Sequence, residues 1–492
     1  MGNDSIDSSD GDRRPEMTNG SPVTRREFLK LAGIAGAGIG LSTGLGAALA
    51  ACGGEETTTT SGATTSTVGA TTTSTEGTST TAAVETGREV KVGFISPRTG
   101  NLAAFGVADG YCVDRWNEFV ADGLVCGDGK NHPINIIVLD SQSDTNRAAQ
   151  VAGDLILNDK VDVIMAASTP EVVNPIADQA EALETPCLTC QAPMEPYYFG
   201  RGGTPDKGFK WTYHLFWGLT EYMATSFDLW SQLPTNKVIG AMWPNDSDGN
   251  AFRPAFTPAM EEAGYKVIDS GPFQDGTEDF TDIITKFKAA GVEIITGVVI
   301  PPDWTNFWKQ SIQQGFKPKV VDIAKPTLFA TTMEALGEIG YGLAGPAWFH
   351  PNFPFKSSLT GESAAEMCLD FEKRNQVQWQ PPIMDYVNFE WVVDVLKRTP
   401  DVDDKEAFMK AVVETNVADS IAGPFDFTAP AQLGTAHPVP NVVSTQLFGG
   451  QWVKGTVQQP WSIKAWPYEL KIVSTVAAPA LQPQGKLGPL AL

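Results

Sequence analysis

The sequence predicts an α/β protein made of two doubly wound lobes, each with a parallel sheet. Short apolar runs alternate with amphipathic helical patterns from Val90 onward, and this alternation is typical of βαβ units. The alternation begins again at Val238, which gives two consecutive units of about domain size. A chain of 492 residues with 42% hydrophobic residues has enough apolar side chains for a packed core in each unit.

Each element of the first unit is predicted from its hydrophobic period. A strand shows a short apolar run, and a helix shows apolar residues three and four positions apart, as Cys112, Trp116 and Phe119 do. In chain order we expect a strand at 91–96, a helix around 112–120, a strand at 134–139, a helix at 143–157, a strand at 161–166, a helix at 171–183 and a strand at 187–190.

The second unit repeats this order. We expect strands at 238–242, 267–268 and 294–299, and helices at 251–263, 279–289 and 304–314. After about Pro346 the pattern loosens, and three further helices, at 363–374, 384–397 and 405–414, are expected to join the first lobe. Open parallel sheets bind ligands beyond the carboxyl ends of their strands, and two such edges that face each other form a cleft. The ends expected here are the loops after Ser96, Ala167, Cys190, Met242 and Ile300.

The first 51 residues are interpreted as an export signal. Arg25 and Arg26 precede an apolar run from 31 to 51 that is rich in Gly and Ala, which is typical of a twin-arginine signal peptide. A permanent transmembrane helix is the alternative, because the run is long enough to span a bilayer. The many glycines favour the processed signal.

A lipid anchor and a tether are expected next. The run ends in Leu49, Ala50, Ala51 and Cys52, which resembles the lipobox of bacterial lipoproteins, so we expect the lipid on Cys52. An ordinary cleavage site with a chance cysteine is the alternative. Residues 52–87 are mostly Thr, Ser, Gly and Ala, which predicts a flexible tether outside the cytoplasm.

Composition and missing motifs restrict the function. The formal net charge of −23 argues against a nucleic-acid partner, because phosphate binding needs a basic face. The four histidines, His132, His214, His350 and His437, lack metal-ligand spacing, and the chain has no GxSxG elbow, Walker loop or GxGxxG. We therefore expect no catalytic residue, no metal and no cofactor.

Five cysteines remain besides Cys52. Cys187 and Cys190 form a CxxC on an expected strand rather than at the start of a helix, which favours a core role over a redox site. Export permits disulfides, and Cys112 and Cys126 bracket the first helix. A Cys112–Cys126 bridge and buried thiols therefore both remain open.

Several segments together resemble the type I periplasmic solute-binding proteins of ABC importers, in the group that binds branched-chain amino acids, amides and urea. The resemblance covers roughly 89–473 and depends on the order and spacing of the segments. They are GFISPRTG at 93–100, AAFG at 103–106, DSQSD at 140–144, LILNDKV at 155–161 and WPNDSDG at 243–249, followed by Phe280 and Phe287-Lys288.

The resemblance implies the type I periplasmic binding protein fold, in which two lobes are joined by three hinge crossings. Here these crossings are expected near 213–218, 345–350 and 423–428. The expected domains are the signal peptide at 1–51, the tether at 52–87, lobe 1 at 88–214 with 346–424, lobe 2 at 215–345 with 425–475, and a tail at 476–492.

The resemblance also implies ligand-binding residues in the first lobe. Phe105 corresponds to an aromatic residue that covers the ligand, and Ser168 and Thr169 correspond to hydroxyls that take a ligand carboxylate. Helix capping is the alternative use of both hydroxyls. Gln191 and Ala192 lie in the loop after the fourth strand, where Gln191 brings an amide.

In the second lobe, Asp248 stands where the family usually has a tyrosine, and Asp303 is nearest to the acid that meets an ammonium group. An N-cap is the alternative for Asp303. Trp348 is a further candidate for the pocket, although core packing is the better account of each tryptophan taken singly. These residues predict a small polar or zwitterionic ligand with an apolar or aromatic part, rather than a plain aliphatic amino acid.

The leading hypothesis is a monomeric, extracytoplasmic lipoprotein that captures a small solute between its lobes and delivers it to an ABC transporter permease. A lipoprotein that presents the ligand to a membrane receptor is the second hypothesis. The third is an extracellular hydrolase that uses Asp246, Asp248 or Asp303. A permease encoded nearby favours the first, and an unchanged ligand in the purified protein opposes the third.

Overall fold

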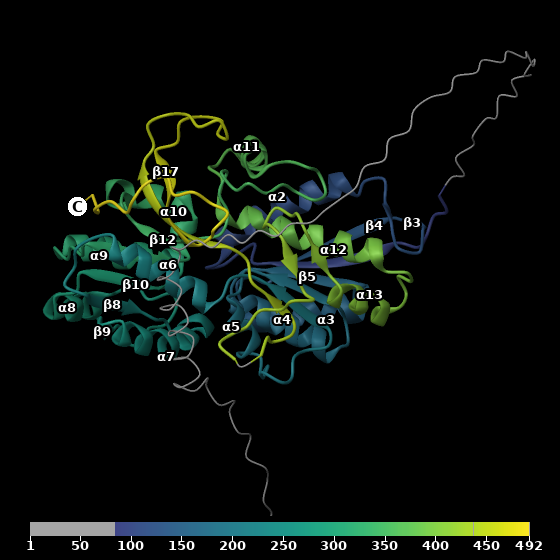
Figure 1. The fold of residues 1–492 in the computed structure, drawn as a ribbon, viewed down its shortest axis with the longest axis horizontal. Coiled ribbons are helices and arrows are strands. Elements are labelled where there is room, and N and C mark those ends of the chain that lie inside the picture. The colour runs from purple at the N-terminus through teal and green to yellow at the C-terminus, as the bar shows by residue number, and fades with distance from the viewer. Residues whose placement is uncertain (1–83, 436, 492) are drawn as a thin grey trace, which may run out of the picture.

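The computed structural model describes residues 84–435 and 437–491. The expected signal peptide, Cys52 and most of the tether lie outside these residues. Figure 1 shows two α/β lobes side by side, each with helices on both faces of a sheet. The predicted fold, with a mainly parallel sheet in each of two lobes, is therefore confirmed.

A six-stranded sheet forms the centre of the first lobe. From edge to edge it contains β15 (Val442–Val443), β7 (Thr212–Leu215), β6 (Cys187–Cys190), β5 (Val163–Ala167), β1 (Val90–Ser96) and β4 (Ile134–Asp140). All its pairings are parallel. Two short pairs lie beside it, β2 (Leu124–Val125) with β3 (Asn131–His132) and β13 (Asn416–Val417) with β14 (Phe425–Asp426).

Helices cover this sheet because each presents an apolar face. They are α2 (Ala103–Phe119), α3 (Thr145–Asp154) with a π-turn at Leu155–Asp159, α4 (Pro170–Ala182), α5 (Met194–Tyr198), α11 (Ala364–Asn375), α12 (Tyr386–Arg398) and α13 (Lys405–Val413). The last three are the helices expected to join this lobe. In α12, Asn388 donates from Nδ2 to the Ala166 carbonyl of β5 at 3.1 Å, which ties the helix to the sheet.

A seven-stranded sheet forms the centre of the second lobe. From edge to edge it contains β17 (Tyr468–Ala477), β16 (Leu447–Lys454), β12 (Ala344–Ala347), β11 (Val320–Ala324), β10 (Ile294–Val298), β8 (Val238–Met242) and β9 (Lys266–Asp269). β16 runs antiparallel to both neighbours. The helices are α6 (Leu219–Ser231), α7 (Ser247–Glu262), α8 (Thr281–Ala290), α9 (Pro301–Gln313) and α10 (Ala330–Leu336).

Three internal strands, β7, β11 and β12, were not expected from the sequence, and the first two each carry a buried polar side chain. In β11, Asp322 is buried and accepts a hydrogen bond from the indole Nε1 of Trp230 at 3.0 Å. In β7, His214 is buried and bonds to Ala192 and Thr189. A polar residue that finds its partner only in the fold interrupts the apolar run on which the prediction rested.

The third crossing between the lobes lies elsewhere than expected. The expected crossing near 423–428 is wrong, because β15 pairs in parallel with β7 and so keeps the chain in the first lobe as far as Val443. The chain enters the second lobe at 444–446, between β15 and β16. Phe425 and Asp426 pair instead with β13, beside the first lobe.

The five cysteines of the described region are buried free thiols. The Sγ of Cys112 lies 3.7 Å from the Ile383 carbonyl and that of Cys126 lies 3.7 Å from the Leu124 carbonyl, so the Cys112–Cys126 bridge is not formed. Within residues 84–435 and 437–491, no helix combines the length and the apolar character that crossing a bilayer requires.

Candidate ligand-binding site

Strained backbone marks the strand ends where the lobes meet. Ser168 follows β5 with φ 135°, Gln191 follows β6 with φ 72°, and Lys325 follows β11 with φ 78°. Such angles cost about 1–3 kcal/mol each for residues with a Cβ, and they gather at ligand sites. Three strand ends therefore carry a strained backbone angle, and two of them, after β5 and β6, are ends at which we expect a ligand.

Two direct contacts close the space between these edges. Glu171, in the first turn of α4, accepts a hydrogen bond from the backbone N–H of Ser247, the first residue of α7, at 2.6 Å. Phe105 of α2 meets Phe329, which lies just before α10, edge to face with ring centroids 5.0 Å apart. The strand ends of the two lobes therefore meet in direct contact.

A buried lysine stands at the centre of the polar contacts. Lys325 Nζ lies 3.1 Å from Asp246 Oδ2 and 2.9 Å from Asp248 Oδ2. Oxygens of Glu171, Asp246 and Asp248 lie within 4.8 Å of one another. Three such carboxylates would suit a hard divalent cation, but the ammonium group already bridges two of them.

Burial and charge set the protonation of this cluster. Burial, together with the nearby charges of Glu171 and Asp246, raises the pKa of Asp248 to about 7 against the attraction of Lys325. Burial also raises the pKa of Glu171, but the charge of Lys325 and hydrogen bonds bring that pKa below its ordinary value. Burial lowers the pKa of Lys325, yet the facing acids outweigh it and raise that pKa. Glu171 and Lys325 are thus charged at neutral pH.

The predicted hydroxyl residues are buried and do not cap a helix. Ser168 is 1% exposed and Thr169 is 3% exposed. Thr169 is the N-cap of α4, but its side chain makes no capping bond, so the capping alternative is wrong. Within the described part of the chain, neither hydroxyl oxygen has a hydrogen-bond partner. Both are available to a ligand, since buried polar groups are rarely left unpaired.

Gln191 reaches a second buried pair of acids beneath the cleft. Its Nε2 donates to Asp385 Oδ1, and its Oε1 has no partner among the described residues. Burial and the adjacent Asp109 raise the pKa of Asp385, while burial raises the pKa of Asp109 to about 6. Ser96 Oγ donates to Asp109 Oδ2 at 2.5 Å. The pair therefore holds a proton near neutral pH and supports the Gln191 loop.

Two of the predicted residues are already bonded within the protein. The Ala192 carbonyl accepts a bond from His214 Nε2 at 2.6 Å. The Asp303 carboxylate accepts from the backbone N–H of Gly276 at 3.1 and 3.0 Å, and Ile300 rather than Asp303 is the N-cap of α9. The N-cap alternative for Asp303 is wrong, and this acid anchors a neighbouring loop.

Aromatic side chains line the first and second crossings. Trp348 lies 4.8 Å from Phe216 and 6.0 Å from Trp217, centroid to centroid. The indole N–H groups of Trp217 and Trp348 have no acceptor among the residues that the structure describes. The indole N–H of Trp304 likewise has no acceptor among these residues, and its ring stacks on Trp308 at 5.5 Å within the second lobe.

Sequence reasoning missed Glu171, Lys325, Asp385 and Phe329. Lys325 and Phe329 follow β11, the strand that Asp322 concealed. A lysine directly after an apolar run at a sheet edge is the signal that identifies this position once the strand is recognised. Asp385 lies in the connection before α12, which approaches the site only in the fold.

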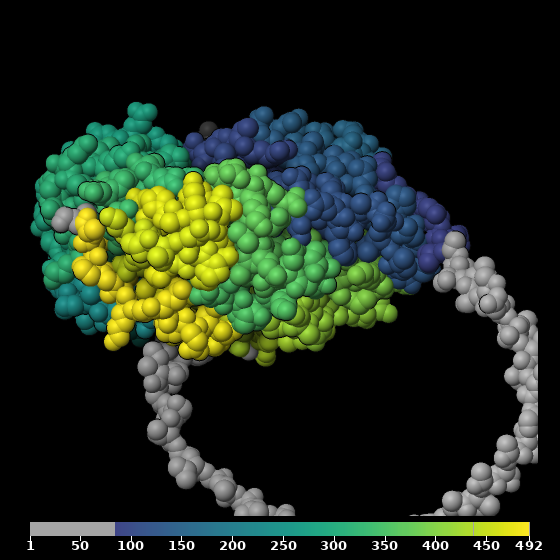
Figure 2. All heavy atoms as spheres, turned by 90° about the horizontal axis from the view of Figure 1, so that it is seen from above, coloured from purple at the N-terminus to yellow at the C-terminus, as the bar shows by residue number. Residues whose placement is uncertain are grey.

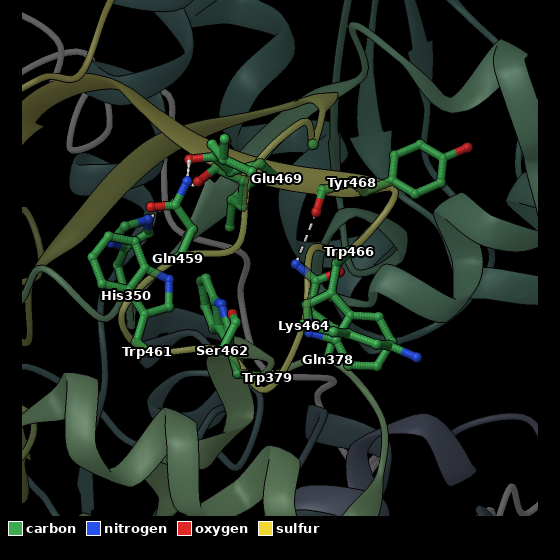
Figure 3. Close-up of a pocket in the computed structure, with 13 residues that line it drawn as sticks. His350, Gln378, Trp379, Gln459, Trp461, Ser462, Lys464, Trp466, Tyr468 and Glu469 are labelled. Atoms are coloured by element: carbon green, nitrogen blue, oxygen red, sulfur yellow. Dashed lines mark hydrogen bonds between the residues drawn. The ribbon is translucent and has the colours of Figure 1, made fainter.

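Two hollows lie away from this cleft. A cavity of about 20 Å³, enough for about one water molecule, is enclosed by aromatic residues that include His350, Trp379 and Trp461 (Figure 3). In the same view Gln459 donates from Nε2 to Glu469 Oε1 at 3.1 Å. A groove of about 340 Å³ runs beside the end of α2 and is lined by residues from Asn117 to Ile134.

Comparisons with known proteins agree with this architecture. A family model described as periplasmic binding protein matches residues 89–450. The structure resembles the leucine-binding protein LivK of Thermotoga maritima, with 16% identity, a TM-score of 0.62, and coverage of 80% of this chain and 100% of that chain.

Two ligand complexes are also similar in fold. One is LivJ of Streptococcus pneumoniae with isoleucine, at 14% identity and TM-score 0.61, covering 78% of this chain and 99% of that chain. The other is an ABC transporter solute-binding protein of Rhodopseudomonas palustris with 3,4-dihydroxybenzoic acid, at 17% identity and TM-score 0.59, covering 74% and 93%.

Proposed function

The chain belongs to the periplasmic binding protein family, a family of non-enzymatic binders, and from this premise we propose that it is the substrate-binding lipoprotein of an ABC importer. The observation that carries the proposal is the direct contact between the facing strand ends of the two lobes, near which buried hydroxyl, amide and indole groups have no partner among the described residues. Groups of this kind are stable in a dry cleft when a ligand bonds to them.

We infer a small polar organic solute with an aromatic or apolar part. Phe105 and Phe329 supply the apolar walls, and Ser168, Thr169 and Gln191 supply hydrogen-bonding groups. Asp248 contributes Oδ1, which lacks a partner in the described region. Trp348 packs against Phe216 and Trp217 at the crossings, while Ala192 and Asp303 hold neighbouring loops. The two proteins of similar fold bind isoleucine and 3,4-dihydroxybenzoic acid, which are small polar solutes with an apolar or an aromatic part.

The first test identifies the solute and its effect on shape. Mass spectrometry of protein purified from its native host should reveal one small molecule per chain, and removing it should increase the radius of gyration in solution scattering. Phe105→Ala should weaken binding about fivefold or more, because an aromatic pair contributes about 0.5–1.5 kcal/mol beyond its buried area. A chemically altered solute or an unchanged radius would contradict the proposal.

The second test concerns the anchor. With Cys52 at the end of the expected signal, Cys52→Ser should move the protein from the membrane fraction to the soluble extracytoplasmic fraction. The paired change Arg25→Lys with Arg26→Lys should leave the precursor in the cytoplasm, which checks the export route separately. If the Cys52→Ser variant still fractionates with membranes, the proposed lipid anchor is wrong, and the proposed solute binding is unaffected.

A further inference from the structure

We propose that Glu171 and Lys325 occupy, with the protein's own charged groups, the positions that the two ends of a zwitterionic amino acid would take in this cleft. The cleft then selects an aromatic solute that carries hydroxyl or carbonyl groups and no ammonium group. This inference rests on the proposed function, because it assumes that a solute binds between the lobes.

The carboxylate-binding position is held by Glu171. The N-termini of α4 and α7 meet at the cleft, and helix N-termini attract anions. Glu171 lies in the first turn of α4 and accepts the Ser247 N–H at the start of α7 at 2.6 Å. At the same end of α7, Asp246 Oδ1 accepts the Gly249 N–H at 2.6 Å. A ligand carboxylate placed there would meet the negative charges of the protein instead of free donors.

The ammonium-binding position is held by Lys325. Its Nζ lies 3.1 Å and 2.9 Å from the carboxylates of Asp246 and Asp248, as an ammonium group does when two acids bind it. The side chain is 8% exposed. A second ammonium group would enter a buried space beside an existing cation, where like charges repel most strongly.

The groups left without partners are suited to another ligand chemistry. Among the described residues, the unpaired groups are Ser168 Oγ, Gln191 Oε1, Asp248 Oδ1 and the indole N–H groups of Trp217 and Trp348, and all five residues are at least nine-tenths buried. The hydroxyl, the amide oxygen and the indole donors are neutral and match hydroxyl and carbonyl groups. The free oxygen of Asp248 accepts from a ligand hydroxyl, because Lys325 already holds the other oxygen of that carboxylate. Phe105 and Phe329 offer ring faces and edges to an aromatic body.

The experiment removes the side chains of Glu171 and Lys325 and asks whether free glycine binds in their place. In the double variant Glu171→Ala with Lys325→Ala, glycine at millimolar concentration should raise the Tm by about 3 °C or more. The wild type should not respond to glycine or leucine, because its own side chains hold both positions. The exposed pair Lys210 and Glu406 provides the control, since removing it by alanine substitution should create no response.

Two results would overturn the inference. One is calorimetric binding of leucine by the wild type that Asp248→Asn abolishes. The other is a folded double variant that glycine does not stabilise. If the double variant does not fold, Glu171→Gln with Lys325→Met preserves side-chain volume, and wild-type indifference to leucine remains the measurement. A wild-type protein that copurifies with no solute contradicts the proposed function. The effect of glycine on the Tm of the double variant still tests the role of Glu171 and Lys325 separately.

Discussion

At Ser168 both the backbone and the side chain reduce the stability of the free protein. The φ of 135° lies where residues with a Cβ are strained, and the buried hydroxyl has no partner in the described region. Neither property stabilises the free protein. Together they indicate that this residue is retained for a contact with the ligand.

We therefore expect Ser168→Gly to stabilise the protein while it weakens binding. Glycine adopts this φ without strain, so the free energy of unfolding should rise by about 1 kcal/mol. Loss of the hydroxyl should weaken solute binding about fivefold, the scale of one neutral hydrogen bond. Urea unfolding and calorimetry measure the two effects.

Gln376→Gly is the matched control for this prediction. Gln376 ends α11 with φ 58° at an exposed position, so its replacement should stabilise the protein and leave binding unchanged. Equal loss of stability and affinity in Ser168→Gly would show that Ser168 is a structural residue instead.

Some site residues could be predicted from the sequence immediately around them, and others could not. Ser168, Thr169 and Gln191 were predicted because they follow strands whose apolar runs are unbroken. Lys325 and Glu171 were not predicted, because their roles depend on distant partners. Lys325 pairs with Asp246, 79 residues away, and Glu171 pairs with Ser247, 76 residues away. Pairing at such separations is decided by packing and leaves no periodic pattern.

At the scale of elements, the connection between β16 and β17 crosses to the first lobe. Glu372 of α11 is fully buried and accepts backbone N–H groups from Ile463 at 2.9 Å and from Trp379 at 3.2 Å. Gln378 Nε2 donates to the Tyr468 carbonyl at 3.0 Å. Figure 2 shows the yellow C-terminal segment packed directly against the green segment of the first lobe.

Glu372→Gln should destabilise this contact by about 2 kcal/mol. One carboxylate oxygen becomes an NH₂ group that faces backbone donors, so at least one buried donor loses its acceptor. Chemical denaturation measures the loss. The control is Glu366→Gln at the exposed start of the same helix, where the change should be within about 1 kcal/mol. Equal effects at both positions would contradict a buried interlobe role for Glu372.

α4 and β8 were predicted close to their observed bounds, whereas α6 was not predicted and α2 begins at Ala103, well before its expected start. Three of the strands were missed for a specific physical reason. β7 and β11 carry buried polar residues, and β15 is only two residues long, so pairing with β7 defines it. The third crossing was misplaced for the same reason, because two residues of strand have no recognisable pattern.

At the scale of the whole molecule, some of the many carboxyl groups are buried and hold a proton near neutral pH. Burial raises the pKa of Glu195 to about 8 and that of Asp248 and Glu390 to about 7. In each case the folded chain holds its proton more strongly than the unfolded chain. This stabilisation is complete below the ordinary carboxyl pKa and is lost as the pH rises through about 6 to 8.

We expect a Tm at pH 6.5 that exceeds the Tm at pH 8.5 by about 3 °C or more at fixed ionic strength. The comparison stops at pH 6.5 because burial lowers the pKa of His214 to about 3 and that of His350 to about 4, so both oppose the trend at lower pH. Differential scanning calorimetry measures the shift. Glu195→Gln should reduce it, and a Tm that rises with pH would refute the assignment.

The late strands β16 and β17 have a consequence for how the chain reaches its native state. The sheet of the second lobe begins with strands near residue 238 and is finished by strands at Leu447–Lys454 and Tyr468–Ala477. Gln232, the C-cap of α6, donates from Nε2 to the Val473 carbonyl of β17 at 2.9 Å, so the end of the first helix of this lobe is bonded to its last strand. Neither lobe can therefore complete its sheet before the strands at 442–443 and within 447–477 have been synthesised, so long-range pairing comes late in folding.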